Sequence, residues 1–294
     1  MTEQNTQVQK AQQSQQSPII AFTKALNGEY MSKYLADTLG AKKAEFVANI
    51  TALVSNSTSL QECTPHSIVF SALKATALDL PLDQNLGMAY VIPFNNKKKG
   101  IKEAQFQIGY KGFVQLSIRS GQFKTINVRD VREGEYLGEN FVSGEMLFKQ
   151  VADRTNKPIV GYLAYFKLIN GFEKMLYITK EDAEVFAITY SKSYGSSEKW
   201  AKEQSLWTTS FDAMAKKTIL KALLKGYAPL SVQMQSAIKA DQAVIDEHGE
   251  RYVDNEPKQI EVSQEQQSKA VDMFAKAFDN GQAEDVEIVD ENKE

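Results

Sequence analysis

Apolar side chains in the first third of the chain follow helical spacing. Residues 41–55 place theirs three or four positions apart, which predicts an amphipathic helix carrying Phe46, Val47, Ile50, Leu53 and Val54 on one side. Thr64 followed by Pro65 is typical of a helix start, with Thr64 as N-cap and proline at the first helical position. His66 would lie in that first turn, and we assign it no role.

The spacing then changes to that of strands. Residues 86–94 and 103–110 are strand-like, and the cationic segment 95–100 between them predicts a β-hairpin with a lysine tip. Phe106 and Ile108 share one strand face with Tyr110, so we expect the aromatic rings to be buried and not stacked on bases. Tyr110, at the strand end, could do either.

A helix over residues 111–122, stopped by Gly121, and a strand over 123–131 are predicted next.

The second half of the chain contains a clear hairpin signal. Residues 159–169 and 172–178 flank Asn170-Gly171, which is a strong signal for a β-hairpin. Thr179 and Asp182 form a capping pattern for a helix reaching Tyr190. Residues 209–225 predict another helix that ends at Gly226. The fold class expected is α+β, an antiparallel β-hairpin sheet packed with helices.

Three segments are expected from composition. Residues 1–17 are a Gln-rich flexible arm, residues 18–245 the folded body, and residues 246–294 an acidic linker with one short helix starting near Ser263. That helix carries an apolar stripe of Val271, Phe274 and Phe278, which predicts docking onto the body or onto another protein.

Charge is distributed unevenly along the chain. The net charge is −3, but residues 241–294 hold 16 acidic and 5 basic side chains, while residues 1–240 hold 21 acidic and 29 basic ones. The body is therefore net +8 and the C-terminal segment net −11. A basic body suits an anionic partner such as nucleic acid.

Several classes of protein are disfavoured by what the sequence lacks. No run of about 18 apolar residues predicts a membrane span, and the N-terminus has no hydrophobic segment of the secretory type, so we expect a cytoplasmic protein. Cys63 is the one cysteine, expected to be an inert reduced thiol, and the histidines are His66 and His248. Neither a disulfide framework nor a Cys/His zinc site can be built within one chain.

Enzymatic motifs are also missing. No Gly-Lys dipeptide occurs, so the usual phosphate loop of an ATPase is not predicted. Acid-x-Lys triplets, common in two-metal nucleases, occur only at Glu256-x-Lys258 and Glu291-x-Lys293 in the acidic segment. Asp130, Glu133 and Glu135 remain as a conceivable metal cluster, which keeps a metal-dependent nuclease as an alternative.

Residues 97–132 form the densest cationic region, with nine basic side chains against Glu103 and Asp130. Aromatic residues interleave with them, and this combination suits single-stranded DNA, whose phosphates need charge and whose open bases can stack. The alternative to DNA binding is that the lysine-rich hairpin tip is a solvated turn and that the aromatic side chains belong to the core. The aromatic residues are Phe94, Phe106, Tyr110, Phe113 and Phe123.

A second cationic group follows helical spacing. Lys217, Lys221 and Lys225 recur every four residues and line one face, with Lys216 to the side. No acidic residue alternates with them, which an anionic partner would explain; a plain solvated face is the alternative.

Three longer segments resemble the RecT family of phage-type recombinases. They are QIGYKGFVQLSIRSGQF (107–123), FDAMAKKTILKALLKGYAPLSVQMQSAIKAD (211–241) and ATALDLPLDQNLGMAYVIPF (75–94), and the similarity in character extends over about residues 18–245.

The resemblance implies an ATP-independent protein of a bacterial host's cytoplasm, without a covalent catalytic step. It would coat single-stranded DNA left by a partner exonuclease and anneal it into duplex as an oligomeric ring or helical filament. Magnesium would assist without being a tightly bound cofactor. The acidic segment would bind the exonuclease or a host single-strand binding protein.

The resemblance also implies a basic groove, with residues 109–112 bringing backbone and Lys111 close to phosphates. Besides a nuclease, the alternative functions are a non-catalytic DNA-coating scaffold and an interaction module whose basic body binds its own acidic segment. No catalytic, cofactor-binding or metal-binding residue is predicted. The predicted DNA-binding residues are Lys97, Lys98, Lys99, Lys102, Gly109, Tyr110, Lys111, Gly112, Arg119, Lys124, Arg129, Arg132, Lys216, Lys217, Lys221 and Lys225.

Overall fold

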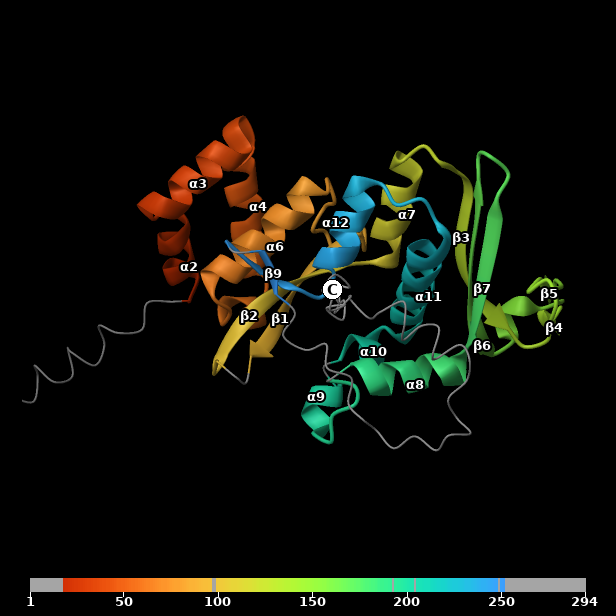
Figure 1. The fold of residues 1–294 in the computed structure, drawn as a ribbon. Coiled ribbons are helices and arrows are strands. Elements are labelled where there is room, and N and C mark those ends of the chain that lie inside the picture. The colour runs from red at the N-terminus through yellow and green to blue at the C-terminus, as the bar shows by residue number, and fades with distance from the viewer. Residues whose placement is uncertain (1–17, 97–98, 192, 204, 248, 252–294) are drawn as a thin grey trace, which may run out of the picture. The chain divides into compact units, whose positions relative to one another are not determined.

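A computed structural model describes residues 18–96, 99–191, 193–203, 205–247 and 249–251 (Figure 1). This part of the chain divides into two units, one comprising residues 18–108 with 240–251 and the other residues 109–239. Each unit combines helices with antiparallel strands, which confirms the predicted α+β class. The Gln-rich arm and the predicted helix from Ser263 lie outside the described residues.

The first unit begins with a group of helices. Helix α6 is buried along most of its length, and Thr64 precedes it as predicted, although its hydroxyl donates to Ser67 Oγ instead of accepting a backbone N–H. The helix predicted over residues 41–55 is confirmed as α4. The helices are α2 (Pro18–Leu26), α3 (Glu29–Leu39), the 3-10 turn η1 (Gly40–Lys42), α4 (Lys43–Ser55), α5 (Thr58–Gln61) and α6 (Pro65–Ala77).

A β-hairpin packs against α6, as the sequence predicts. Strand β1 (Ala89–Asn96) pairs with β2 (Ile101–Ile108), and β2 also receives a bridge from Phe106 to Ala243 on its other edge. Phe106 and Ile108 are fully buried, which confirms the predicted apolar face. Two short strands, β8 (Val244–Asp246) and β9 (Gly249–Arg251), complete the unit.

The second unit is built on a three-stranded antiparallel sheet with the order β3-β6-β7. Its strands are β3 (Phe123–Arg132), β6 (Ile159–Leu168) and β7 (Glu173–Thr179), with a separate hairpin of β4 (Tyr136–Glu139) and β5 (Met146–Phe148). Its helices are α7 (Tyr110–Arg119), the 3-10 turn η2 (Arg154–Asn156), α8 (Lys180–Tyr190), α9 (Lys199–Glu203), α10 (Leu206–Thr209), α11 (Phe211–Tyr227) and α12 (Val232–Ala240).

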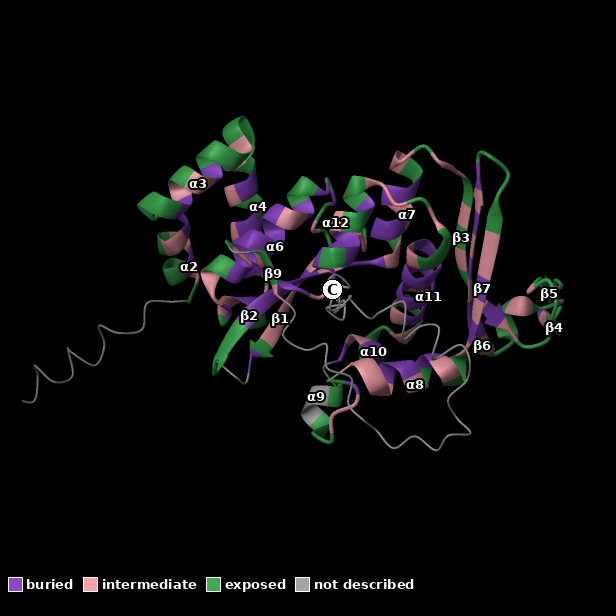
Figure 2. Ribbon diagram, in the orientation of Figure 1, coloured by how far each residue is buried: buried purple, intermediate pink, exposed green. Residues whose placement is uncertain are grey.

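One face of this sheet is covered by α8 and α11 (Figure 1). Along β6, Tyr162, Ala164 and Phe166 are fully buried beneath these helices, while the residues between them are only half-buried on the opposite face (Figure 2). This period of two is what a strand covered on one side requires.

Two local predictions are confirmed in the second unit. Asn170-Gly171 turns β6 into β7, with Gly171 at φ 93° and its N–H donating to the Leu168 carbonyl. The Thr179 hydroxyl accepts a hydrogen bond from the Asp182 N–H at 3.0 Å and caps α8. Across the described residues, no helix is long and apolar enough to cross a membrane.

Candidate nucleic-acid interface

Four cations surround two carboxylates at the end of β3. We call this group, which consists of Arg129, Asp130, Arg132, Glu135, Arg154 and Lys216, the β3 charge cluster. Strand β3 supplies the first three residues. Glu135 lies in the turn between β3 and β4, Arg154 lies in η2 just before β6, and Lys216 lies on α11. All belong to the second unit.

Asp130 lies at the centre of the cluster. Its Oδ2 accepts hydrogen bonds from Arg132 Nε at 2.7 Å and from Arg154 Nη2 at 3.1 Å. Lys216 Nζ approaches its other oxygen, Oδ1, at 3.7 Å. One carboxylate therefore orients three cations.

Glu135 ties the cluster to the neighbouring loops. Its Oε1 accepts a hydrogen bond from Arg154 Nε at 2.7 Å, and its Oε2 accepts one from the Arg132 backbone N–H at 2.6 Å. Arg129 Nη2 lies farther away, at 3.8 Å from Oε1. Glu135 is buried, whereas 46% of the Arg129 side chain is exposed.

The cluster carries more positive than negative charge. Burial acts to raise the pKa of Asp130, but the hydrogen bond from Arg132 and the charges of Arg154 and Lys216 outweigh it and lower that pKa. Both carboxylates form ion pairs, and the four cations and two carboxylates together give the cluster a net charge of +2. Guanidinium groups held in place in this way suit phosphate oxygens, to which arginine donates in a fixed geometry.

The start of α7 is a second cationic position in the same unit. Gly109 is its N-cap, with an extended backbone and no side-chain cap hydrogen bond, and Gly112 is buried in the first turn. Lys111 is exposed between them, and Tyr110 is half-buried as the first helical residue. A helix start directs backbone N–H groups and positive potential toward an anion.

Other predicted cations of this unit differ in exposure. Lys124 is exposed on β3, an edge strand of the described sheet, and Arg119 is half-buried at the end of α7.

The lysine row of α11 differs from the sequence interpretation. Lys217 and Lys221 are only 4% and 1% exposed, and Lys225 is half-buried, so the row is not one solvated face. The reason is that α11 contacts α7, α10 and all three strands of the sheet, which cover most of its circumference. A role of these lysines in DNA binding stays a prediction, and Lys216 is the member that joins the β3 charge cluster.

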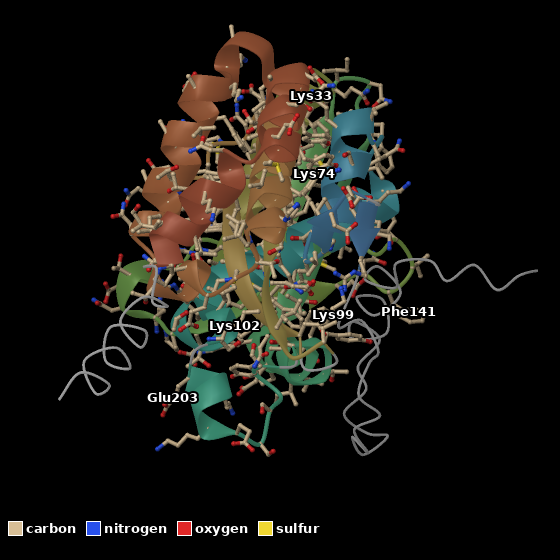
Figure 3. All side chains as sticks on the ribbon, turned by 90° about the vertical axis from the view of Figure 1, so that its left-hand side faces the viewer. Lys33, Lys74, Lys99, Lys102, Phe141 and Glu203 are labelled. Atoms are coloured by element: carbon tan, nitrogen blue, oxygen red, sulfur yellow. The ribbon has the colours of Figure 1, made fainter. Side chains whose placement is uncertain are left out.

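In the first unit, the described lysines of the β1–β2 hairpin, Lys99 and Lys102, are labelled in Figure 3, and both form ion pairs. Lys99 Nζ lies 3.5 Å from Glu103 Oε1, and Lys102 pairs with Glu62. Burial acts to raise the pKa of Glu103, but hydrogen bonds from Asn96 and Arg251 outweigh it and lower that pKa. Lys97 and Lys98 lie outside the described residues.

The carboxylates that suggested a nuclease are engaged elsewhere. Asp130 and Glu135 are bound by arginines, while Glu133 is exposed and its backbone N–H donates to the Pro158 carbonyl. Among the residues that the structure describes, no group of three histidine, cysteine or acidic side chains could hold a metal ion. The geometry therefore favours anion binding over metal binding at this position.

Arg154 is the functional candidate that sequence reasoning missed. It is the first residue of the 3-10 turn η2, 22 residues beyond Arg132, and no local pattern relates it to β3. Pairing of β3 with β6 brings the two together, because Arg154 precedes β6 by a few residues.

Comparisons with known proteins agree with the resemblance of the three sequence segments. The profile described as the RecT family matches residues 44–260. The chain is 39% identical over 214 residues to the uncharacterized protein YqaK of Bacillus subtilis, covering 72% of this chain and 69% of that protein. It is 31% identical over 230 residues to Protein RecT of Escherichia coli, covering 77% and 81% respectively.

Proposed function

Because this chain belongs to the RecT family, we propose that it anneals complementary single strands of DNA, without ATP hydrolysis and without a covalent step. Family membership supports a role in recombination by strand annealing. Base pairing between the two strands would read the sequence. The protein would supply charge neutralisation, an extended DNA backbone and lateral assembly.

The β3 charge cluster carries this proposal. Annealing requires binding of any sequence, which contacts to phosphates provide because phosphates are common to all nucleotides. The cluster has two more positive than negative charges, and its Arg129 is exposed, which fits this requirement. Asp130 and Glu135 fix the arginines before DNA arrives, which reduces the entropy lost on binding.

The start of α7 would add a phosphate contact. Its backbone N–H groups and the exposed Lys111 would face the DNA together, since the extended Gly109 leaves the first turn without a side-chain cap. Lys124 would continue the contact along the edge strand β3.

Assembly and partners belong to the same proposal. Copies would associate into a ring or helical filament, hold first a single strand and then the annealed duplex, and receive DNA from a partner exonuclease in the cytoplasm. Magnesium would assist by screening the repulsion between strands and would need no tightly bound site. The acidic segment would contact the exonuclease or a single-strand binding protein.

Duplex formation from two labelled complementary oligonucleotides, followed over time without ATP, tests the proposal. Acceleration for complementary strands, with none for non-complementary ones, is the expected result. Tight DNA binding without acceleration would contradict annealing and favour the DNA-coating scaffold. Shortened labelled strands after incubation with magnesium or manganese, with shortening lost in Asp130→Ala, would favour the nuclease.

A further inference from the structure

The β4–β5 hairpin exposes a group of apolar side chains. Phe141 and Val142 at its tip are 90% and 94% exposed, and Leu137 and Leu147 on its strands are 56% and 52% exposed. Figure 3 labels Phe141. Exposed apolar side chains are common singly, but four within one hairpin form a patch of the kind found at interaction sites.

The tip of this hairpin has a defined conformation. Asn140 Oδ1 accepts hydrogen bonds from the Val142 and Ser143 N–H groups at 3.0 and 3.2 Å. The Gly144 N–H donates to the Asn140 carbonyl at 2.8 Å, and Gly144 adopts φ 66°, which favours glycine. These bonds hold the apolar tip residues outward.

The base of the hairpin is anchored on the sheet. The ring of Tyr136 stacks on Tyr177 of β7 at a centroid distance of 4.5 Å, and Phe148 packs edge-on against the same ring at 5.9 Å. This cluster lies on the sheet face opposite α8 and α11, so the hairpin projects from the other side (Figure 1). We call this hairpin, which is packed on the sheet at its base and hydrogen-bonded within its tip, the β4–β5 arm.

The charge of the arm is opposite to that of the body. Residues 136–148 contain Glu139 and Glu145, both exposed, and no lysine or arginine, whereas residues 1–240 carry a net charge of +8. Acidic side chains beside an apolar tip disfavour contact with DNA phosphates. They favour a protein surface that is both basic and apolar.

We propose that this arm docks onto the basic body of a second copy of this chain. The proposal deepens the proposed function, because it names the surface through which the annealing assembly forms. A projecting arm that inserts into a different surface of its neighbour makes a head-to-tail contact, and such contacts generate rings or filaments. The other occupant that the arm could contact is DNA, and the experiment separates the two.

Val142→Ser tests the apolar part of the contact, with Val232→Ser as the matched control because Val232 is 82% exposed on α12. Sedimentation velocity without DNA would measure the concentration at which half of the protein is assembled. We expect Val142→Ser to raise that concentration about tenfold, equivalent to about 1.4 kcal/mol, and Val232→Ser to leave it unchanged. Equal assembly of both variants and the wild type would overturn the proposal.

Charge reversal provides the second measurement. Glu139→Lys with Glu145→Lys should weaken assembly and leave the affinity of one protomer for a short oligonucleotide unchanged or slightly higher. Loss of oligonucleotide affinity in Val142→Ser, with unchanged assembly, would overturn the proposal and assign the arm to DNA. If wild-type protein assembles but does not anneal, the proposed function fails, while the assembly of the variants still tests the arm.

Discussion

Arg154 Nε lies 2.7 Å from Glu135 Oε1, which ties the segment before β6 to the turn between β3 and β4. The same guanidinium donates to the Asp130 carbonyl oxygen at 2.6 Å. One arginine therefore bridges a buried carboxylate and the backbone of an edge strand. The β3 charge cluster is thus both a structural crosslink and a source of ordered cations.

Replacement of Glu135 should separate these two roles. Glu135→Gln keeps the size of the side chain but removes one of the two carboxylates that Arg154 binds, the other being Asp130. We therefore expect the free energy of unfolding to fall by about 1–3 kcal/mol. The substitution raises the local charge by one, so the salt dependence of single-stranded DNA binding should not weaken. Urea unfolding and a salt titration measure the two effects. Glu133→Gln, at an exposed position, is the control. An equal free energy of unfolding for the two variants would contradict the role of Glu135 as a crosslink.

The pKa of Asp130 predicts an acid dependence of stability. Its pKa is lowered in the folded protein, so its ionised form stabilises the fold. This contribution is fully present above the unfolded pKa of about 3.9 and is lost as the pH falls through the folded value. Asp130→Asn should therefore lower the urea midpoint at neutral pH and approach the wild type in strong acid. A difference between the two proteins that is independent of pH would contradict this assignment.

Gly161 is expected to tolerate no side chain. A Cβ there would lie 2.5 Å from the Ile178 carbonyl oxygen and from the Tyr177 ring, which anchors the β4–β5 arm. Gly161→Ala should lower the free energy of unfolding by about 1–3 kcal/mol or more and displace the arm. Gly226→Ala is the control, because nothing lies within 4 Å of its Cβ position in α11. It should raise the melting temperature, and a similar loss in both variants would rule out the steric account.

Lys111 and Lys221 should respond differently to truncation. Lys221 is 1% exposed, so Lys221→Ala removes a packed aliphatic stem and should lower the free energy of unfolding by about 1–3 kcal/mol. Lys111 is exposed, so Lys111→Ala should leave unfolding unchanged, weaken DNA binding equally for all sequences and flatten its salt dependence. Thermal unfolding and binding at several salt concentrations check both variants. An unchanged salt slope in Lys111→Ala would remove α7 from the interface.

Local patterns in the sequence predicted much of the fold. Asn170-Gly171, the Thr179 cap and the buried face of Phe106 and Ile108 depend on neighbouring residues, and the structure confirms each. The β4–β5 arm was missed because its strands have four and three residues and alternate too briefly to be recognised.

The candidate site was predicted less completely, because tertiary contacts assemble it. Arg129, Arg132 and Lys216 were expected from local charge, but Arg154 joins them only through the pairing of β3 with β6. Helical spacing placed Lys217 and Lys221 on one face of α11 and gave no indication that other elements cover that face.

The rate of annealing in variants of the β3 charge cluster tests the account most directly. Arg129→Gln combined with Lys216→Gln removes the two surplus charges, whereas Lys199→Gln removes an 89% exposed lysine outside the cluster. At moderate salt and without ATP, we predict that the wild type and Lys199→Gln accelerate pairing of complementary strands, and that the double variant is slower by at least about tenfold. Equal rates for all three proteins would contradict the assignment of DNA binding to this cluster.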